Sequence, residues 1–252
     1  MIISYTHRFI FIKPRKTAGS TVELALSPFL APGDIATPLE PGEEPLRRVA
    51  PGVVVAMVPR RGVWPPGRPL RDHAPLARVL AHVDGIDGYR VVSMCRNPWD
   101  RAVSAFFWWL RRSDIRSRPE AEQVQAFRAF TRRWGPASWL DRVWGRKRNR
   151  ALDSTPLYTV AGQPRVDFAI RYERLADDLA ALGPWLGLEG VPRLGGLAAK
   201  SGVRPEGARG WAAFYDEATR ELVARACARE IALFGYDFEG LAEPRGPVLS
   251  RP

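Results

Sequence analysis

Short apolar runs alternate along the chain with amphipathic segments. Residues 9–12, 91–95 and 166–170 are predominantly apolar, which is typical of strands buried on both faces. Apolar residues at helical spacing predict helices over 22–26, 72–83, 98–112, 120–133, 137–144, 173–182 and 216–234. Strands that alternate with helices predict an α/β fold, with an open, mainly parallel sheet and helices on both faces.

Two of these helices begin with recognisable capping residues. Asn97 is suited to the N-cap, Pro98 to the first helical position and Asp100 to the first turn, where the helix dipole favours a negative charge. Asp72 is expected to cap the helix that carries His73. The sequence therefore places Asp72 and His73 together at a helix start.

A proline-rich excursion interrupts the pattern. Residues 28–75 contain 11 of the 23 prolines, and only 53–58 within them are expected to form a strand. The chain contains no internal repeat and no convincing linker. We therefore expect a single domain over residues 1–245, followed by a C-terminal tail over 246–252.

Composition narrows the class of protein. A chain of 252 residues with 46% hydrophobic residues can fill a core, which excludes disorder throughout. Its two cysteines exclude a disulfide framework and a cysteine-based zinc site. No apolar run is long enough to span a bilayer and no secretion signal is recognisable, so a soluble, cytoplasmic protein is expected.

The charge balance points to anionic partners. The formal net charge is +11, and four of the 38 basic residues are lysines, so 34 are arginines. Arginine binds phosphate and sulfate groups in a bidentate way, which favours nucleotides, nucleic acids or acidic glycans. Charge alone does not choose among them.

Residues 16–21 (KTAGST) lie where an apolar strand ends and a helix begins. Free backbone amides at a helix start, two hydroxyls, a close-approach glycine at Gly19 and the Lys16 ammonium together predict an anion-binding loop. The usual mononucleotide loop places its lysine after the second glycine, whereas Lys16 precedes Gly19. An ordinary ATP or GTP loop is therefore disfavoured, and a plain strand-to-helix turn is the alternative.

A second stretch, residues 96–104 (RNPWDRAVS), also follows a predicted buried strand. Ligands of open α/β sheets bind outside the carboxyl ends of the strands, so Arg96 is expected to reach the same ligand as the first loop. The alternative is that Arg101 and Arg111 are exposed helix cations and Ser104 is a packing residue.

Together the two stretches resemble the sulfotransferases that use 3′-phosphoadenosine 5′-phosphosulfate (PAPS). Residues 16–21 resemble their 5′-phosphosulfate loop, and residues 96–98 with Ser104 resemble their 3′-phosphate motif. Residues 166–175 resemble the segment that approaches the adenine, and 216–238 resemble the C-terminal helix of bacterial members related to carbohydrate sulfotransferases. The resemblance implies a P-loop-like fold and sulfuryl transfer to a hydroxyl or amine, with a glycan or other small acceptor as partner.

The resemblance also implies a role for each matched residue. Lys16 stabilises the bridging oxygen as the S–O bond breaks, the amides around 17–21 hold the 5′-phosphate, and Tyr172 packs near the adenine. Arg96 and Ser104 bind the 3′-phosphate. The expected cofactor-binding residues are Arg15, Lys16, Thr17, Ala18, Gly19, Ser20, Thr21, Arg96, Ser104 and Tyr172.

The general base is the least determined role. His73 is the first candidate, because imidazole accepts a proton near neutral pH and related enzymes carry a histidine between the two motifs. Glu23, one turn into the helix after the loop, is the second candidate. Glu43 or Glu44 in the excursion is the third, because some family members use a glutamate.

Two other classes of protein remain as alternatives. No histidine cluster or acidic pair marks a metal site, so no metal is expected. A nucleotide kinase of the same architecture would need a Walker-type lysine and a magnesium carboxylate. A module that binds nucleic acid or another polyanion would rest on the net charge alone, and nucleic acid is not the expected partner. The sequence carries no signal for an oligomeric state.

Overall fold

The computed structural model describes residues 1–58, 69–132, 153–195, 210–240 and 246–249. The described residues of Met1–Cys95, Thr155–Ala199 and Gly246–Pro252 form one compact unit, and those of Arg96–Ser154 and Lys200–Arg245 form a second. The expected single domain over 1–245 stays a prediction.

A six-stranded sheet lies within the described residues of the first unit, in the order β4-β3-β1-β2-β5-β8. All neighbouring strands are parallel except β1, which is antiparallel to both β2 and β3. The predicted α/β fold with a mainly parallel sheet is therefore confirmed, although the antiparallel strand was not predicted. The strands are β1 (Ile2–Ser4), β2 (Phe9–Ile12), β3 (Ile35–Ala36), β4 (Val54–Val55), β5 (Arg90–Cys95) and β8 (Phe168–Arg171).

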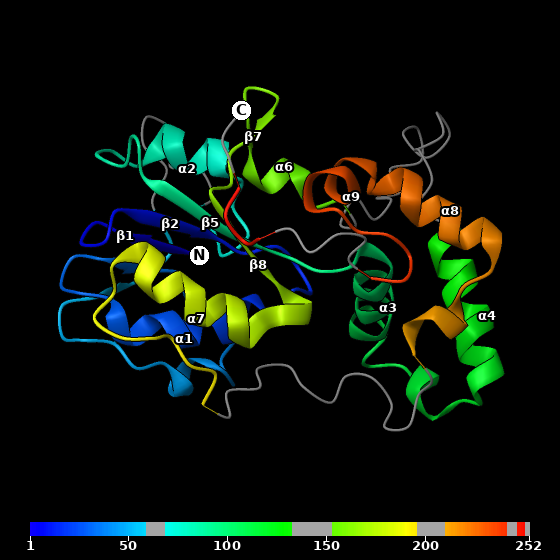
Figure 1. Cartoon of the computed structure of the whole chain (residues 1–252). Coiled ribbons are helices and arrows are strands. Elements are labelled where there is room, and N and C mark those ends of the chain that lie inside the picture. Colours follow the sequence, from blue (N-terminus) through cyan, green and yellow to red (C-terminus); the bar gives the residue numbers. More distant parts are fainter. Residues whose placement is uncertain (59–68, 133–152, 196–209, 241–245, 250–252) are drawn as a thin grey trace. The chain divides into compact units, whose positions relative to one another are not determined.

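Helices cover both faces of this sheet (Figure 1). Phe9 and Phe11 of β2 pack with α1 and α7, whereas Ile10 and Ile12 pack with α2 on the opposite face. Successive side chains of a strand point to opposite faces, so an apolar residue at every position lets β2 be buried on both. The helices are α1 (Gly19–Leu26), α2 (Leu76–His82), α6 (Thr155–Tyr158) and α7 (Leu175–Leu186), beside a small hairpin of β6 (Thr159–Val160) and β7 (Gln163–Pro164).

The excursion contributes two short strands to the sheet. The strand expected over 53–58 is confirmed as the two-residue β4, and β3 was not predicted. Asp34, just before β3, is buried, and its carboxylate accepts hydrogen bonds from the Ser4 hydroxyl and from the amides of Tyr5 and Thr6. Asp34 therefore ties the excursion to the β1–β2 turn.

The first residues of the expected C-terminal tail are bonded to the other edge of the sheet. The Ala169 amide donates to the Pro247 carbonyl at 2.7 Å, and the Leu249 amide donates to the Asp167 carbonyl at 2.9 Å. Phe168 and Val248 form an antiparallel bridge between these two bonds. Residues 246–249 therefore extend the sheet beyond β8.

The helix predicted over 72–83 begins later than expected. It begins at Leu76, with Pro75 at the N-cap, so Asp72 caps no helix and His73 lies in a turn before it. Proline disfavours the helical conformation for the residue before it, which here is Ala74, and this separates Asp72 and His73 from α2.

The second unit is helical in its described part. Its elements are α3 (Pro98–Trp109), α4 (Glu120–Thr131), α8 (Glu217–Ala226) and α9 (Ala228–Phe234), with 3-10 turns at Asp114–Ser117 and Trp211–Phe214. The predicted helices over 98–112 and 120–133 are confirmed, and the one over 216–234 is divided into α8 and α9 at Cys227. The helix predicted over 137–144 lies outside the described residues.

A buried ion pair holds α3 and α9 together within this unit. Arg101 is 1% exposed, and its guanidinium donates to the Glu230 carboxylate at 2.5 and 2.6 Å and to the Ser154 hydroxyl at 2.6 Å. The alternative that Arg101 is an exposed helix cation is therefore wrong. At the start of α3, the Asn97 side chain accepts hydrogen bonds from the amides of Trp99 and Asp100, which confirms the predicted cap.

Candidate functional site

The predicted anion-binding loop joins β2 to α1. Lys16 and Ala18 both adopt positive φ, at 62° and 66°, a conformation that costs a residue with a Cβ about 1–2 kcal/mol. Ala18 is the N-cap of α1 and makes no side-chain capping bond. The chain therefore enters the helix through a strained turn whose first amides lack a side-chain cap, as an anion-binding helix start requires.

Two hydroxyls lie in the first turn of α1. Ser20 is 6% exposed and Thr21 is 5% exposed, yet neither side chain makes a hydrogen bond within the described part of the chain. Thr17 differs, because its hydroxyl donates to the Pro14 carbonyl at 3.0 Å and so closes the loop on itself. Ser20 and Thr21 therefore retain the hydrogen-bonding capacity that a bound anion would use.

Gly19 is required by a neighbouring side chain. A Cβ built at Gly19 would lie 2.0 Å from Cγ and 2.5 Å from Cδ of Lys13, which is closer than a Cβ approaches carbon atoms of another residue. Sequence reasoning attributed this glycine to the close approach of an anion. The packing of the Lys13 stem is a second reason for it.

Lys13 and Glu23 form a buried ion pair beneath the loop. Lys13 is 3% exposed and Glu23 is fully buried, and the Lys13 ammonium contacts Glu23 Oε2. The Met1 amino group, whose pKa burial lowers to about 6, lies 2.5 Å from Glu23 Oε1. Burial raises the pKa of Glu23, but the Met1 and Lys13 ammonium groups outweigh this, and the net pKa lies below its usual value. Glu23 is therefore ionised with both oxygens occupied, which favours a structural role for this second candidate base.

His73 is connected to the loop through Lys13. Its Nδ1 donates to the Lys13 carbonyl oxygen at 2.6 Å, because only the nitrogen can carry the proton of this bond. Its Nε2 lies 3.1 Å from Asp72 Oδ2. Among the described residues, Nε2 and Asp72 Oδ2 are within ion-pair distance but do not form a hydrogen bond. The lone pair of Nε2 can therefore accept a hydrogen bond from another donor.

Burial controls the protonation of this pair. It lowers the pKa of His73 to about 4, although the Asp72 carboxylate and the bond to the Lys13 carbonyl favour the protonated ring. Burial raises the pKa of Asp72, but the charges of His73 and Lys13 lower it by more than burial raises it. The net pKa lies below its usual value, so Asp72 is ionised. At neutral pH the His73 ring is therefore a neutral base with a carboxylate beside the nitrogen that would take a proton.

The remaining candidates of the first unit lie in the excursion, in the loop and directly after β8. Glu44 accepts hydrogen bonds from the Arg47 Nε at 2.6 Å and from the Leu39 amide at 2.7 Å, so it ties down the excursion. Glu43 is 8% exposed. Arg15 is exposed beside the loop, and Tyr172, at 37% exposed, begins the turn after β8.

The candidates of the second unit belong to the start of α3. Arg96 is 7% exposed, and its Nε donates to Asp100 Oδ2 at 2.6 Å. Ser104 is half-buried two turns into the helix. Their predicted role at a 3′-phosphate stays a prediction.

Sequence reasoning missed Lys13 as a member of the site and gave Asp72 only a capping role. The residue types alone could have indicated these site residues. A lysine directly after a buried strand and an Asp-His dipeptide both place ionisable groups at the ends of secondary-structure elements. Nothing in their spacing indicated that residues 60 positions apart would meet, as the Lys13 carbonyl and His73 do.

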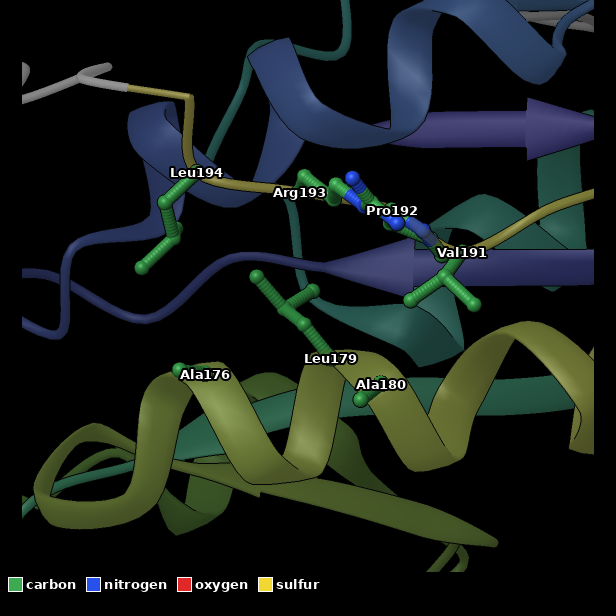
Figure 2. A pocket seen from close by; sticks show the side chains of 7 residues that line it. All are labelled: Ala176, Leu179, Ala180, Val191, Pro192, Arg193 and Leu194. Atoms are coloured by element: carbon green, nitrogen blue, oxygen red, sulfur yellow. The ribbon is translucent and has the colours of Figure 1, made fainter.

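A pocket of about 410 Å³ lies elsewhere in the first unit (Figure 2). It is bordered by α7 and by residues 191–194, and none of the predicted site residues lines it. Its walls are aliphatic except for Arg193. Within the described ranges no three His, Cys, Asp or Glu side chains are grouped so as to share a metal ion, and none of the helices is long and apolar enough to cross a bilayer.

Comparison with known proteins gives one structural similarity. No family model and no curated protein matches the sequence. The chain is similar to a crystal structure described as a sulfotransferase from Alicyclobacillus acidocaldarius, with 16% sequence identity and a TM-score of 0.47 over 94% of this chain and 98% of that one. The residues of the site therefore have to indicate the function.

Proposed function

We propose that this chain is a sulfotransferase that moves a sulfuryl group from PAPS to a hydroxyl or amine acceptor. The proposal rests on the start of α1. A strained turn leads there into a helix whose first amides have no side-chain cap. Two buried hydroxyls at the same place have no hydrogen-bond partner among the described residues. These features suit the 5′-phosphate end of such a nucleotide.

The loop residues divide the work of binding and stabilisation. The amides of Gly19, Ser20 and Thr21, with the two hydroxyls, hold the phosphate. Lys16 supplies a positive charge at the same turn and stabilises the charge that develops on the leaving oxygen. When bound, PAPS supplies the sulfuryl group and leaves as adenosine 3′,5′-bisphosphate.

His73 is the proposed general base. The Lys13 carbonyl fixes the proton on Nδ1, so Nε2 takes the proton that the acceptor loses when its oxygen or nitrogen forms the new bond to sulfur. The Asp72 carboxylate, 3.1 Å away, then stabilises the imidazolium. Because the pKa of His73 is lowered to about 4, the base form is fully populated at neutral pH.

Arg96 and Ser104 are the proposed ligands of the 3′-phosphate, on the strength of the sequence motif. A carbohydrate is the proposed acceptor on the same ground, and the arginine-rich composition suits an acidic glycan.

Thermal unfolding with added nucleotides tests the proposal. A ligand at 100 times its dissociation constant adds about 2.7 kcal/mol to stability. We expect adenosine 3′,5′-bisphosphate to stabilise the protein and ATP to do so far less. Ser20→Ala combined with Thr21→Ala should weaken the effect, whereas Ser117→Ala, at an exposed serine of the second unit, should not.

The same experiment distinguishes the alternatives. Stabilisation by Mg-ATP with no response to adenosine 3′,5′-bisphosphate would favour a kinase. Binding of heparin or DNA with steep salt dependence and no specific nucleotide response would favour a polyanion-binding module. Transfer of labelled sulfate from PAPS to a panel of acceptors then identifies the acceptor class.

A further inference from the structure

Lys13 contacts both members of the Asp72–His73 pair through different groups. Its carbonyl oxygen accepts the His73 Nδ1 proton at 2.6 Å, and its Nζ lies 3.7 Å from Asp72 Oδ2. The same Asp72 oxygen lies 3.1 Å from His73 Nε2. We propose that Lys13 is a positioning residue for His73: its carbonyl fixes the ring, and its ammonium holds Asp72 beside Nε2. The inference rests on the proposed function, in which His73 takes the acceptor proton.

The Lys13 side chain is itself held at both ends. Its stem packs on Gly19, where no Cβ would fit, and its ammonium contacts the fully buried Glu23. An exposed lysine is mobile and forms weak ion pairs, whereas this one is 3% exposed and has a defined place. The side chain of Asp72 is 35% exposed, so a fixed ammonium is what gives this carboxylate a fixed position.

The proposal has an electrostatic consequence at the His73 ring. Asp72 favours the protonated ring, while the Lys13 and Arg15 cations oppose it, and the Met1 ammonium acts on Asp72. Lys13 Nζ lies within about 7 Å of Nε2, because both contact the same oxygen. At that distance removal of a unit charge raises the ring pKa by on the order of one pH unit.

Removal of the Lys13 ammonium alone would leave the buried Glu23 carboxylate beside the Met1 amino group, which burial leaves largely uncharged at neutral pH, and this loss of charge can unfold the protein. The main test variant is therefore Lys13→Met combined with Glu23→Gln, which removes both charges and preserves side-chain size. Glu23→Gln alone is the matched control, because it keeps the ammonium beside Asp72, and its thermal unfolding is measured first because it removes one member of the same buried ion pair. The carbonyl of residue 13 is unchanged in both.

The first measurement is an NMR titration of the His73 ring without nucleotide or acceptor. Only His7, His73 and His82 contribute ring signals, and His73→Gln identifies the one of interest. We expect the ring pKa to be about one unit higher in the double variant than in Glu23→Gln, because these two proteins differ only at Lys13. In turnover assays with PAPS, the double variant should lower kcat about 10- to 100-fold and change the KM for PAPS far less. The pH at which kcat falls on the acid side should increase together with the pKa of the His73 ring.

Asp72→Asn tests whether Lys13 acts through Asp72. The substitution lies at a partly exposed side chain, should lower kcat by a similar factor, and should leave little further loss when the double variant is added to it. A ring pKa in the double variant that lies within about 0.3 units of the value in Glu23→Gln overturns the proposal. If adenosine 3′,5′-bisphosphate fails to bind while the ring pKa shifts as expected, the proposed function falls and the placement of Lys13 stands.

Discussion

Replacement of Gly19 by alanine tests the packing beneath the loop. In most helices this change is favourable by up to about 1 kcal/mol. Here the new methyl group would lie 2.0 Å from Lys13 Cγ, so the Lys13 stem must move and its ammonium must leave the buried Glu23. Breaking a buried ion pair costs about 3–5 kcal/mol, so we expect a net loss of about 2–4 kcal/mol in the free energy of unfolding.

Urea denaturation measures this loss directly. With a slope of about 2 kcal/mol per molar, the midpoint should fall by about 1–2 M. Gly42→Ala is the matched control, because a Cβ there meets no atom within 4 Å and the substitution should change stability by less than about 0.5 kcal/mol. In the Lys13→Met, Glu23→Gln background the cost of Gly19→Ala should fall to about 1 kcal/mol or less, since no ion pair remains to break. An equal cost in both backgrounds would show that the loss of stability does not come from the Lys13–Glu23 ion pair.

Three further predictions concern the base, the helix cap and the nucleotide contacts. Folding lowers the pKa of His73 from 6.5 to about 4, so the contribution of the neutral ring to stability is present above pH 6.5 and is lost as the pH falls through 4. Between pH 7 and pH 4 the wild type should therefore lose about 3 kcal/mol more stability than His73→Gln. Urea midpoints at each pH measure this difference. Asn97→Ala should cost about 1–2 kcal/mol in thermal unfolding, because two amides of α3 lose their acceptor. Lys16→Ala should lower kcat far more than PAPS affinity, whereas Arg96→Ala should mainly weaken PAPS binding, as single-turnover kinetics and calorimetry would separate.

Each of these has an outcome that contradicts it. Parallel loss of stability with pH in wild type and His73→Gln would show that the ring is not the buried neutral base described here. An unchanged melting temperature for Asn97→Ala would show that the Asn97 cap does not stabilise α3. Equal effects of Lys16→Ala on turnover and on affinity would contradict a role at the leaving oxygen.

The sequence predicted the parts of the fold that local chemistry determines. β2 was predictable because every position is apolar, β5 because its residues are mostly apolar, and α3 because Asn97 and Pro98 are placed as a cap requires. The antiparallel β1 was not predicted, because three residues carry too short a pattern to distinguish a strand from an apolar terminus.

The sequence predicted the residues of the loop but not the buried residues that pack against it. Residues 16–21 form one contiguous motif, so their chemistry is readable from the sequence. Lys13, Asp72 and Glu23 meet through tertiary packing, and the distance between them along the chain leaves no local signal. Burial of Arg101 against Glu230, 129 positions away, escaped prediction for the same reason.

A crystal structure of the protein with adenosine 3′,5′-bisphosphate would show whether the start of α1 binds phosphate. We expect the 5′-phosphate to lie on the amides of Gly19 to Thr21, with the Ser20 and Thr21 hydroxyls as donors. Electron density for the nucleotide at any other place, or a loop left empty at saturating nucleotide, would contradict it.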